Sequence, residues 1–271
     1  MIDLNAGCGN WPFRPIRANT AAGLRELLQA EGVQKACAYP LESYFWPDCQ
    51  EANELRLPEL AKDDFFVPSA VLNPTLPNGL SSYEICRNEW GVPLVRLLPS
   101  YHLYDLSHQG IEPLVERAEE DGVILGVHIL AEDKRNRNPI LIEPPEVPFV
   151  DIVDLARRHP NLQVVAYCWA RIGAVGSVVP NGHIRDLAQI EELEPRADVP
   201  DNLHVDLSFF EFEDTFSSAL KIFRADRLIL GTHAPLHYPK AAILKIQNSA
   251  APEEAKTAAL AGNARRLLGL A

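Results

Sequence analysis

The sequence feature that most limits the fold is a series of eight short apolar runs, each followed by a loop and then by apolar residues at helical spacing. The runs cover residues 2–5, 35–39, 65–72, 94–98, 123–130, 163–168, 203–207 and 227–230. Eight βα units in series are typical of a closed barrel of parallel strands, which needs about 250 residues. We therefore predict an α/β fold, a (β/α)8 TIM barrel, formed as a single domain by residues 1–271.

Helix signals between the runs support this prediction. Apolar residues form helical stripes at Leu24, Leu27 and Leu28, at Ile111, Leu114, Val115 and Ala118, and at Phe149, Ile152, Val153 and Ala156. Stop signals at residues 31–32, 121–122 and 159–161 end these helices before the next strand. An open doubly wound sheet is the rival α/β fold, but no Gly-x-Gly-x-x-Gly or phosphate-binding loop follows any run.

The loops after the strands are longer and chemically richer than the loops before them. They contain aromatic, histidine and arginine residues that a plain turn does not need, so we expect the functional pocket at the carboxyl ends of the strands. The longest loop, residues 131–148, follows the fifth strand and combines charged residues with prolines. It is either a lid over the pocket or a solvated, proline-stiffened loop.

Charge and cysteine content exclude several classes of protein. A formal net charge of −12 repels phosphate backbones and anionic membranes, so no nucleic-acid or membrane partner is expected. The five cysteines form no Cys-x-x-Cys pair and are expected to be buried thiols. No apolar run of 18 residues and no leader segment is recognisable, which predicts a cytoplasmic protein. Homo-oligomerisation stays possible.

Four polar residues lie where predicted strands end: Asn5, His128, Tyr167 and His233. An imidazole, with an intrinsic pKa near 6.5, suits proton transfer at neutral pH. We therefore predict His233 as the catalytic base, with His128 sharing this role and Tyr167 donating a hydrogen bond to a developing oxyanion. For each of them, the alternative is a hydrogen-bonded core residue without a catalytic role.

Several segments, taken in order, resemble the amidohydrolase superfamily, in particular the branch that contains aminocarboxymuconate-semialdehyde decarboxylase and metal-free lactonases. The matching segments are residues 2–7, 126–128, 160–167, 205–208, 230–235 and 262–268. The resemblance spans nearly the whole chain and implies a barrel enzyme that acts on small acidic molecules.

The metal site of that superfamily is degenerate in this sequence. Its His-x-His motif on the first strand is replaced by residues 5–7, Asn-Ala-Gly. The histidine that the family has on the sixth strand falls on Tyr167, and the aspartate of the eighth strand falls on His233. A catalytic metal ion needs about three protein ligands, so we predict no metal and no cofactor. The alternative is one divalent ion between His128 and His233, with Asp3 or Asp206 as a further ligand.

Substrate contacts are expected from residues at or after the strand ends. Arg96 lies inside an apolar strand, where a guanidinium needs a carboxylate partner, either Asp3 or Asp206, or a substrate carboxylate. Aromatic rings after the strands suit the wall of a pocket for a lactone or an aromatic compound. The predicted substrate-binding residues are Asn5, Trp11, Arg14, Tyr44, Arg96, His102, Trp169 and Arg171.

Three functions are compatible with these residues. The first is a metal-independent hydrolase of a small lactone, ester or related carboxylated compound. The second is a catalytically silent barrel that binds a ligand or a partner, and the third is a one-metal hydrolase or decarboxylase. Each implies a small-molecule ligand or partner, and the first is the leading hypothesis.

Overall fold

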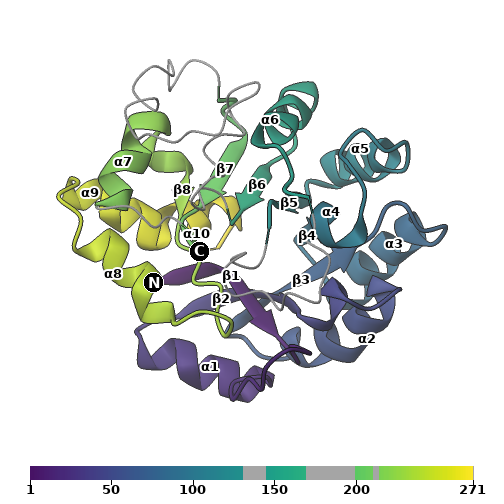
Figure 1. Cartoon of the computed structure of the whole chain (residues 1–271), viewed down its shortest axis with the longest axis horizontal. Coiled ribbons are helices and arrows are strands. Elements are labelled where there is room, and N and C mark those ends of the chain that lie inside the picture. The colour runs from purple at the N-terminus through teal and green to yellow at the C-terminus, as the bar shows by residue number, and fades with distance from the viewer. Residues whose placement is uncertain (131–144, 169–198, 210–213, 271) are drawn as a thin grey trace.

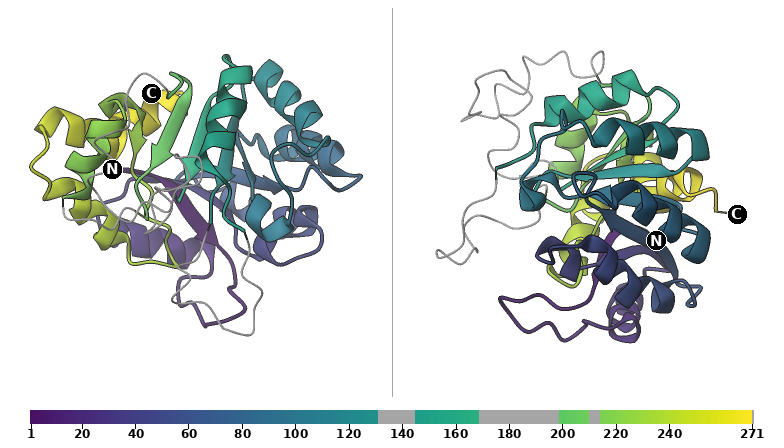
Figure 2. Two further views of the ribbon diagram at one scale, coloured as in Figure 1. Left: turned by 45° about the horizontal axis from the view of Figure 1, so that its top comes forward. Right: turned by 90° about the vertical axis from the view of Figure 1, so that its right-hand side faces the viewer.

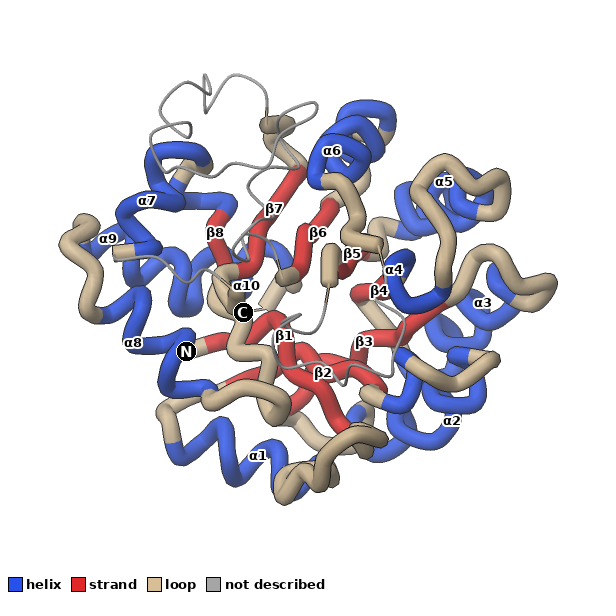
Figure 3. Tube along the Cα trace, viewed as in Figure 1, coloured by secondary structure: helices blue, strands red, loops and turns tan. Residues whose placement is uncertain are grey.

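The strands of the protein form one parallel barrel, and the predicted (β/α)8 fold is confirmed. The computed structural model describes residues 1–130, 145–168, 199–209 and 214–270. Within them, eight strands follow one another around the barrel in sequence order (Figures 1 and 3). They are β1 (Ile2–Cys8), β2 (Lys35–Pro40), β3 (Phe66–Leu72), β4 (Leu94–Leu97), β5 (Ile124–His128), β6 (Val164–Tyr167), β7 (Leu203–Asp206) and β8 (Leu228–Ile229). Each predicted run contains or overlaps its strand, with ends that differ by at most three residues.

Helices surround the strands on the outside of the barrel (Figures 1 and 2). The α-helices are α1 (Ala21–Ala30), α2 (Cys49–Leu60), α3 (Gly79–Trp90), α4 (Pro99–His102), α5 (Ile111–Asp121), α6 (Phe149–Arg158), α7 (Thr215–Ile222), α8 (Pro239–Gln247), α9 (Glu253–Thr257) and α10 (Asn263–Leu267). Shorter helical turns are η1 (Glu42–Tyr44), η5 (Ala225–Arg227) and the π-helical η6 (Ala258–Gly262). The predicted stripes on α5 and α6 are buried against the barrel.

Local sequence explains where several of these helices begin and end. The side chains of Thr20, Asp48 and Asp214 each accept a hydrogen bond from a backbone N–H in the first turn of the helix that follows. Gly91 and Gly122 end α3 and α5 in the left-handed conformation, which favours glycine. The predicted stops after Ala30, Asp121 and Arg158 are therefore confirmed.

The barrel closes between its first strand and the segment after β8. Leu4 N–H donates to the Leu230 carbonyl at 2.9 Å, and His233 N–H donates to the Asn5 carbonyl at 2.7 Å. Ala6 and Ala234 form a parallel bridge one step further along. Closure places His233 beside Asn5, although 228 positions separate them in the sequence.

The barrel interior is apolar over most of its length. Side chains from several strands fill it, including Ile2, Leu4, Leu94, Val165 and Ile229. A second apolar layer lies between the strands and the outer helices. All five cysteines are free and buried, as predicted. In the described part of the chain, no helix is both long and apolar enough to span a membrane.

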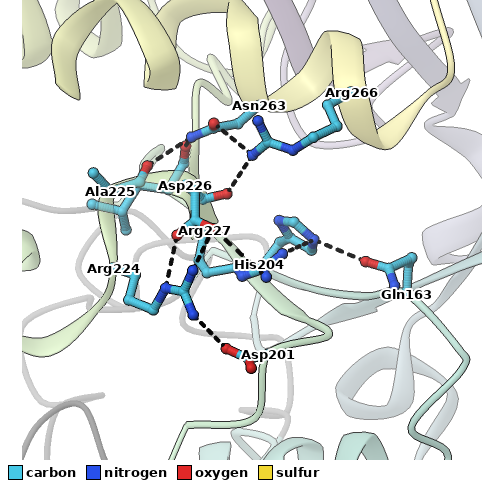
Figure 4. A network of polar contacts seen from close by, with 10 residues as sticks. Gln163, Asp201, His204, Arg224, Ala225, Asp226, Arg227, Asn263 and Arg266 are labelled. Atoms are coloured by element: carbon cyan, nitrogen blue, oxygen red, sulfur yellow. Dashed lines mark hydrogen bonds and ion pairs between the residues drawn. The ribbon is translucent and has the colours of Figure 1, made fainter. Parts of the chain in front are cut away.

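A polar network fastens the C-terminal helix to the amino-terminal end of β8 (Figure 4). Asn263 donates to the carbonyls of Ala225 and Leu228 at 2.7 and 2.8 Å. His204, at the start of β7, lies 3.1 Å from Gln163 Oε1 and 3.4 Å from an Arg227 nitrogen. Burial, together with the nearby arginines, lowers the pKa of His204 to about 3. This histidine is neutral in the folded protein.

The free energy of unfolding is expected to decrease as the pH is lowered, partly because of His204. Below about pH 6.5 the unfolded chain binds a proton on this residue, but the folded chain does not until about pH 3. Between pH 6.5 and about pH 4, wild type should lose roughly 3 kcal/mol more stability than His204→Gln. Urea unfolding of both proteins across this range measures the difference, and parallel stability curves would contradict the prediction.

Candidate active site

Four strands bring the predicted catalytic residues together at one end of the barrel. His128 and Tyr167 are partners in the register of β5 and β6, and their rings stack with centroids 4.8 Å apart. Asn5 and His233 meet through the closure of the barrel. Asn5, His128 and His233 each lie within 4.0 Å of one buried atom, Cys168 Sγ. The residues predicted at separate strand ends therefore form one cluster.

Arg96 is the buried cation of this cluster, and its partners differ from the prediction. None of its hydrogen bonds within the described residues goes to Asp3 or Asp206. Its five N–H groups are accounted for by five contacts, with Ser69 Oγ, Asn5 Oδ1, His128 Nε2, the Leu4 carbonyl and Cys37 Sγ. The guanidinium also lies between the rings of Tyr39 and Tyr167, 4.3 and 4.1 Å from their centroids. These contacts replace the expected pairing with Asp3 or Asp206, and a contact of Arg96 with a substrate carboxylate stays a prediction.

The contact with Arg96 fixes the protonation of His128. A guanidinium can only donate, so His128 Nε2 accepts its hydrogen bond at 3.0 Å and the ring proton is on Nδ1. Nδ1 lies 3.2 Å from the hydroxyl of Tyr44, which in turn lies 3.0 Å from that of Tyr39. Burial, with Arg96 and His233 nearby, lowers the pKa of His128 well below its ordinary value. His128 is therefore a neutral ring with both nitrogens engaged, which does not suit the shared base role that we predicted for it.

Asn5 joins the cation to a carboxylate. Its Oδ1 accepts from Arg96 at 3.1 Å, while its Nδ2 donates to Asp206 at 2.8 Å. An amide offers an acceptor and a donor on opposite sides, so it can lie between a guanidinium and a carboxylate. An ionised aspartate could accept from Arg96 but could not donate to Asp206. The amide of Asn5 satisfies both of these neighbours.

Two buried carboxylates anchor the backbone around the site. Asp3 accepts from the backbone N–H and the hydroxyl of Thr232, and from Asn5 N–H. Asp206 accepts from Cys168 N–H at 2.7 Å and from the Ser208 hydroxyl at 3.1 Å. Burial raises the pKa of Asp3 to about 6, and it raises that of Asp206 as well. Both residues hold the residues that follow β6 and β8 in place.

Two glycines allow this close packing. A Cβ atom on Gly126 would lie 2.5 Å from the Tyr167 ring, and one on Gly231 would lie 2.2 Å from an Asp206 oxygen. Real Cβ contacts are never this short, so larger residues would push the ring and the carboxylate away. The two positions belong to the segments whose resemblance to the amidohydrolases was noted above.

The other predicted substrate-binding residues lie in different surroundings. Trp11 is buried and packs edge-on against Tyr44, with ring centroids 5.4 Å apart. His102 Nε2 donates to the Ser43 carbonyl at 2.9 Å, which directs it into the protein. Arg14 is exposed and donates to the Leu236 carbonyl in the segment after β8. Trp169 and Arg171, and most of the loop 131–148, lie outside the described residues.

The contacts of Tyr167 with the other site residues are made by its ring and not by its hydroxyl. The ring covers one face of Arg96 and stacks on His128. The hydroxyl is buried and has no hydrogen-bond partner in the described part of the chain. The hydrogen bond to an oxyanion stays a prediction.

Sequence reasoning missed Cys168 as a member of the site. We expected it only to be one of five buried thiols, because the cysteines form no Cys-x-x-Cys pair. Its position immediately after Tyr167, at a predicted strand end, was the available signal.

The donor set around His128 and His233 does not fit a divalent metal ion. The Nε2 lone pair of His128 and the Oδ1 atom of Asn5 are both engaged by the positively charged Arg96. A metal ion there would have to displace a cation already in place. Nor do the described residues contain a group of three or more His, Cys, Asp or Glu side chains that could hold a metal.

Comparisons with known proteins agree with this architecture. A family model described as amidohydrolase matches residues 43–270. The chain belongs to this amidohydrolase family. It is therefore an amidohydrolase-superfamily enzyme, as the resemblance implied. A search of the curated proteins found no match.

Solved structures with the same fold include several decarboxylases. 5-Carboxyvanillate decarboxylase LigW from Sphingomonas paucimobilis has a TM-score of 0.73 at 13% identity, covering 100% of this chain and 99% of that one. 2,6-Dihydroxybenzoate decarboxylase in complex with 2,6-dihydroxybenzoate has a TM-score of 0.67 at 18% identity, with 99% of each chain covered. A dihydroxybenzoic acid decarboxylase from Polaromonas, with bound manganese and the inhibitor 2-nitroresorcinol, has a TM-score of 0.63 at 15% identity, covering 99% and 96%.

Proposed function

We propose that this amidohydrolase-family enzyme hydrolyses a small carboxylated lactone or ester without a metal ion, using His233 as the base. The observation that supports metal independence most directly is the position of Arg96. Its guanidinium donates to His128 and Asn5, so a fixed positive charge of the protein lies beside the residues that β1 and β5 contribute to the site. The enzyme would then activate water or substrate with side chains alone.

His233 is the residue best placed to move a proton. It follows β8 in a left-handed backbone conformation, with φ at 55°, and its N–H is held by the Asn5 carbonyl. Its ring packs against Phe209 and His237, with centroids 5.2 and 5.3 Å away. The Nδ1 atom faces Cys168 Sγ at 4.0 Å. A histidine that is fixed in this way at the end of a barrel strand suits general base catalysis.

A carboxylated substrate is supported by the related folds and by an exposed arginine. The compared decarboxylases act on or bind carboxylated aromatic compounds, as their names state. Arg14 uses one nitrogen for the Leu236 carbonyl, and its guanidinium is exposed beside the segment after β8. Among the residues that the structure describes, Arg14 is our candidate for pairing with a substrate carboxylate. Trp11 and Phe13, just before Arg14 in the sequence, form an edge-on aromatic cluster with Phe45 that could wall the substrate.

Chelation tests the metal independence. Dialysis against EDTA, with or without Mn²⁺ or Zn²⁺ added back, is expected to change turnover in a lactone and ester screen by less than about twofold. The melting temperature should not depend on metal concentration, because Arg96 already engages His128 and Asn5. A stoichiometric ion retained after purification, with activity lost on its removal, would overturn the proposal. Metal-dependent release of CO₂ from a carboxylated phenol would instead favour a decarboxylase.

A further inference from the structure

Cys168 occupies a turn that directs its side chain into the cluster. It is the first residue after β6 and has a φ of 59°, in the left-handed region that non-glycine residues seldom adopt. The conformation costs on the order of 1 kcal/mol, and the hydrogen bond from Cys168 N–H to Asp206 holds it in place. A residue that simply continued the strand would not need this bond.

The sulfur lies among polar side chains of the site. Asn5 Nδ2 donates to Sγ at 3.8 Å, while the Ser208 hydroxyl, also 3.8 Å from Sγ, has its one proton on Asp206 at 3.1 Å. His128 Nδ1, which has the ring proton, lies 4.0 Å away. The His128 ring proton points to the Tyr44 hydroxyl at 3.2 Å, so of these three groups Asn5 is the donor that favours the negative form of the sulfur. His233 Nδ1, also at 4.0 Å, is the neighbour that can receive the thiol proton.

A second cysteine–histidine pair in the same protein lacks this chemistry. Cys49 Sγ lies 3.5 Å from His102 Nε2, which is closer than Cys168 is to His233. However, His102 Nε2 donates to the Ser43 carbonyl, so it has a proton and cannot accept one from the thiol. Burial raises the pKa of Cys49 to about 12. Cys49 is therefore a natural control of similar burial.

The geometry points to Cys168 as the nucleophile of this site and to His233 as the base that activates it, forming a thioester with the ester or lactone substrate. This inference rests on the proposed hydrolase function. The Cys168 proton moves to His233 Nδ1 while Sγ attacks the substrate carbonyl carbon. The carbon–oxygen bond then breaks, and the leaving alkoxide takes the proton from His233. A water molecule, deprotonated by His233, attacks the thioester, and the released thiolate regains the proton.

Alkylation tests the nucleophile without any substrate. The native protein is treated with iodoacetamide at neutral pH, and the five cysteines are quantified by mass spectrometry of peptides. Cys168 is expected to react at least about tenfold faster than Cys49, and His233→Asn should remove most of this difference. Cys8, Cys37 and Cys86, which are buried and have raised pKa values, serve as further controls. Reaction of Cys168 at the rate of Cys49 would overturn the inference.

A second experiment separates this inference from the proposed function. p-Nitrophenyl acetate is expected to give a burst of p-nitrophenol and an acetyl group on Cys168, both lost in Cys168→Ala. Cys168→Ser, with a matching circular dichroism spectrum, controls for folding. If lactone or ester turnover persists in Cys168→Ala but is lost in His233→Asn, Cys168 is not the nucleophile. The proposed hydrolase function would not be affected by that result. Selective labelling and acetylation without turnover of any lactone or ester would support the nucleophile and reject the substrate class.

Discussion

Replacing Arg96 with methionine is expected to lower the free energy of unfolding by about 3–5 kcal/mol, the usual cost of removing one partner from a buried charged network. Methionine retains the length of the aliphatic part of arginine but lacks the guanidinium and donates no hydrogen bond. The acceptors on Asn5, His128 and Leu4 would be left buried without their donor, and each such atom costs about 1–3 kcal/mol. Asp206 would also lose the cation to which Asn5 connects it.

Thermal and urea unfolding measure this effect, with Arg117→Met as the matched control. Arg117 pairs with Asp121 at 3.0 Å, but its side chain is 44% exposed, so the same substitution there should cost no more than about 1 kcal/mol. Arg96→Lys retains the charge with fewer donors and should fall between wild type and Arg96→Met. Equal stability of the two methionine variants would show that Arg96 is not the structural cation described above.

Replacing His233 with asparagine is expected to reduce kcat by at least about 100-fold on a lactone or ester that the enzyme hydrolyses. Asparagine tolerates the left-handed backbone found at this position, so the fold should persist while the base is lost. Because a base must be unprotonated to accept a proton, the wild-type rate should fall at acidic pH as the imidazole becomes protonated. The variant should lose this acidic limb.

The control for that experiment is His204→Gln, which removes a buried histidine near the opposite end of the strands. His204 is the second residue of β7 and contacts Gln163 and Arg227, outside the hydrogen-bond network of the site. The kcat of the His204→Gln variant should stay within about twofold of wild type at neutral pH. If His233→Asn retains comparable activity and the same pH profile, the assignment of His233 as the base is wrong.

Much of the architecture was predictable because it depends on local patterns. Short apolar runs followed by helical stripes predicted all eight strands, and glycine or cap residues predicted several helix ends. The parallel barrel then places Asn5, His128, Tyr167 and His233 at one end, since all strands run in the same direction. Strand ends were less certain, because the last residues of a strand depend on which neighbour they meet.

The chemistry within the site was less predictable. The sequence indicated that Arg96 needs a partner, but a charged one was expected, whereas the structure gives it neutral acceptors and two aromatic faces. His128 kept its family identity, but Arg96 occupies its Nε2, which does not suit the expected base role. Cys168 belongs to the site because it adopts a left-handed backbone conformation directly after β6, which no sequence pattern predicted.

The sequence by itself determined the eight βα units, the end of the barrel where chemistry is placed and the loss of the family's metal ligands. The first two follow from spacing and residue type along the chain, and the third from the resemblance to the amidohydrolases. Tertiary structure alone decided that Arg96, from the middle of β4, meets Asn5 and His128, and that Cys168 lies between His128 and His233. The reason is physical: hydrogen-bond partners and tautomers are set by distances of a few ångströms between strands far apart in sequence, which no local pattern encodes.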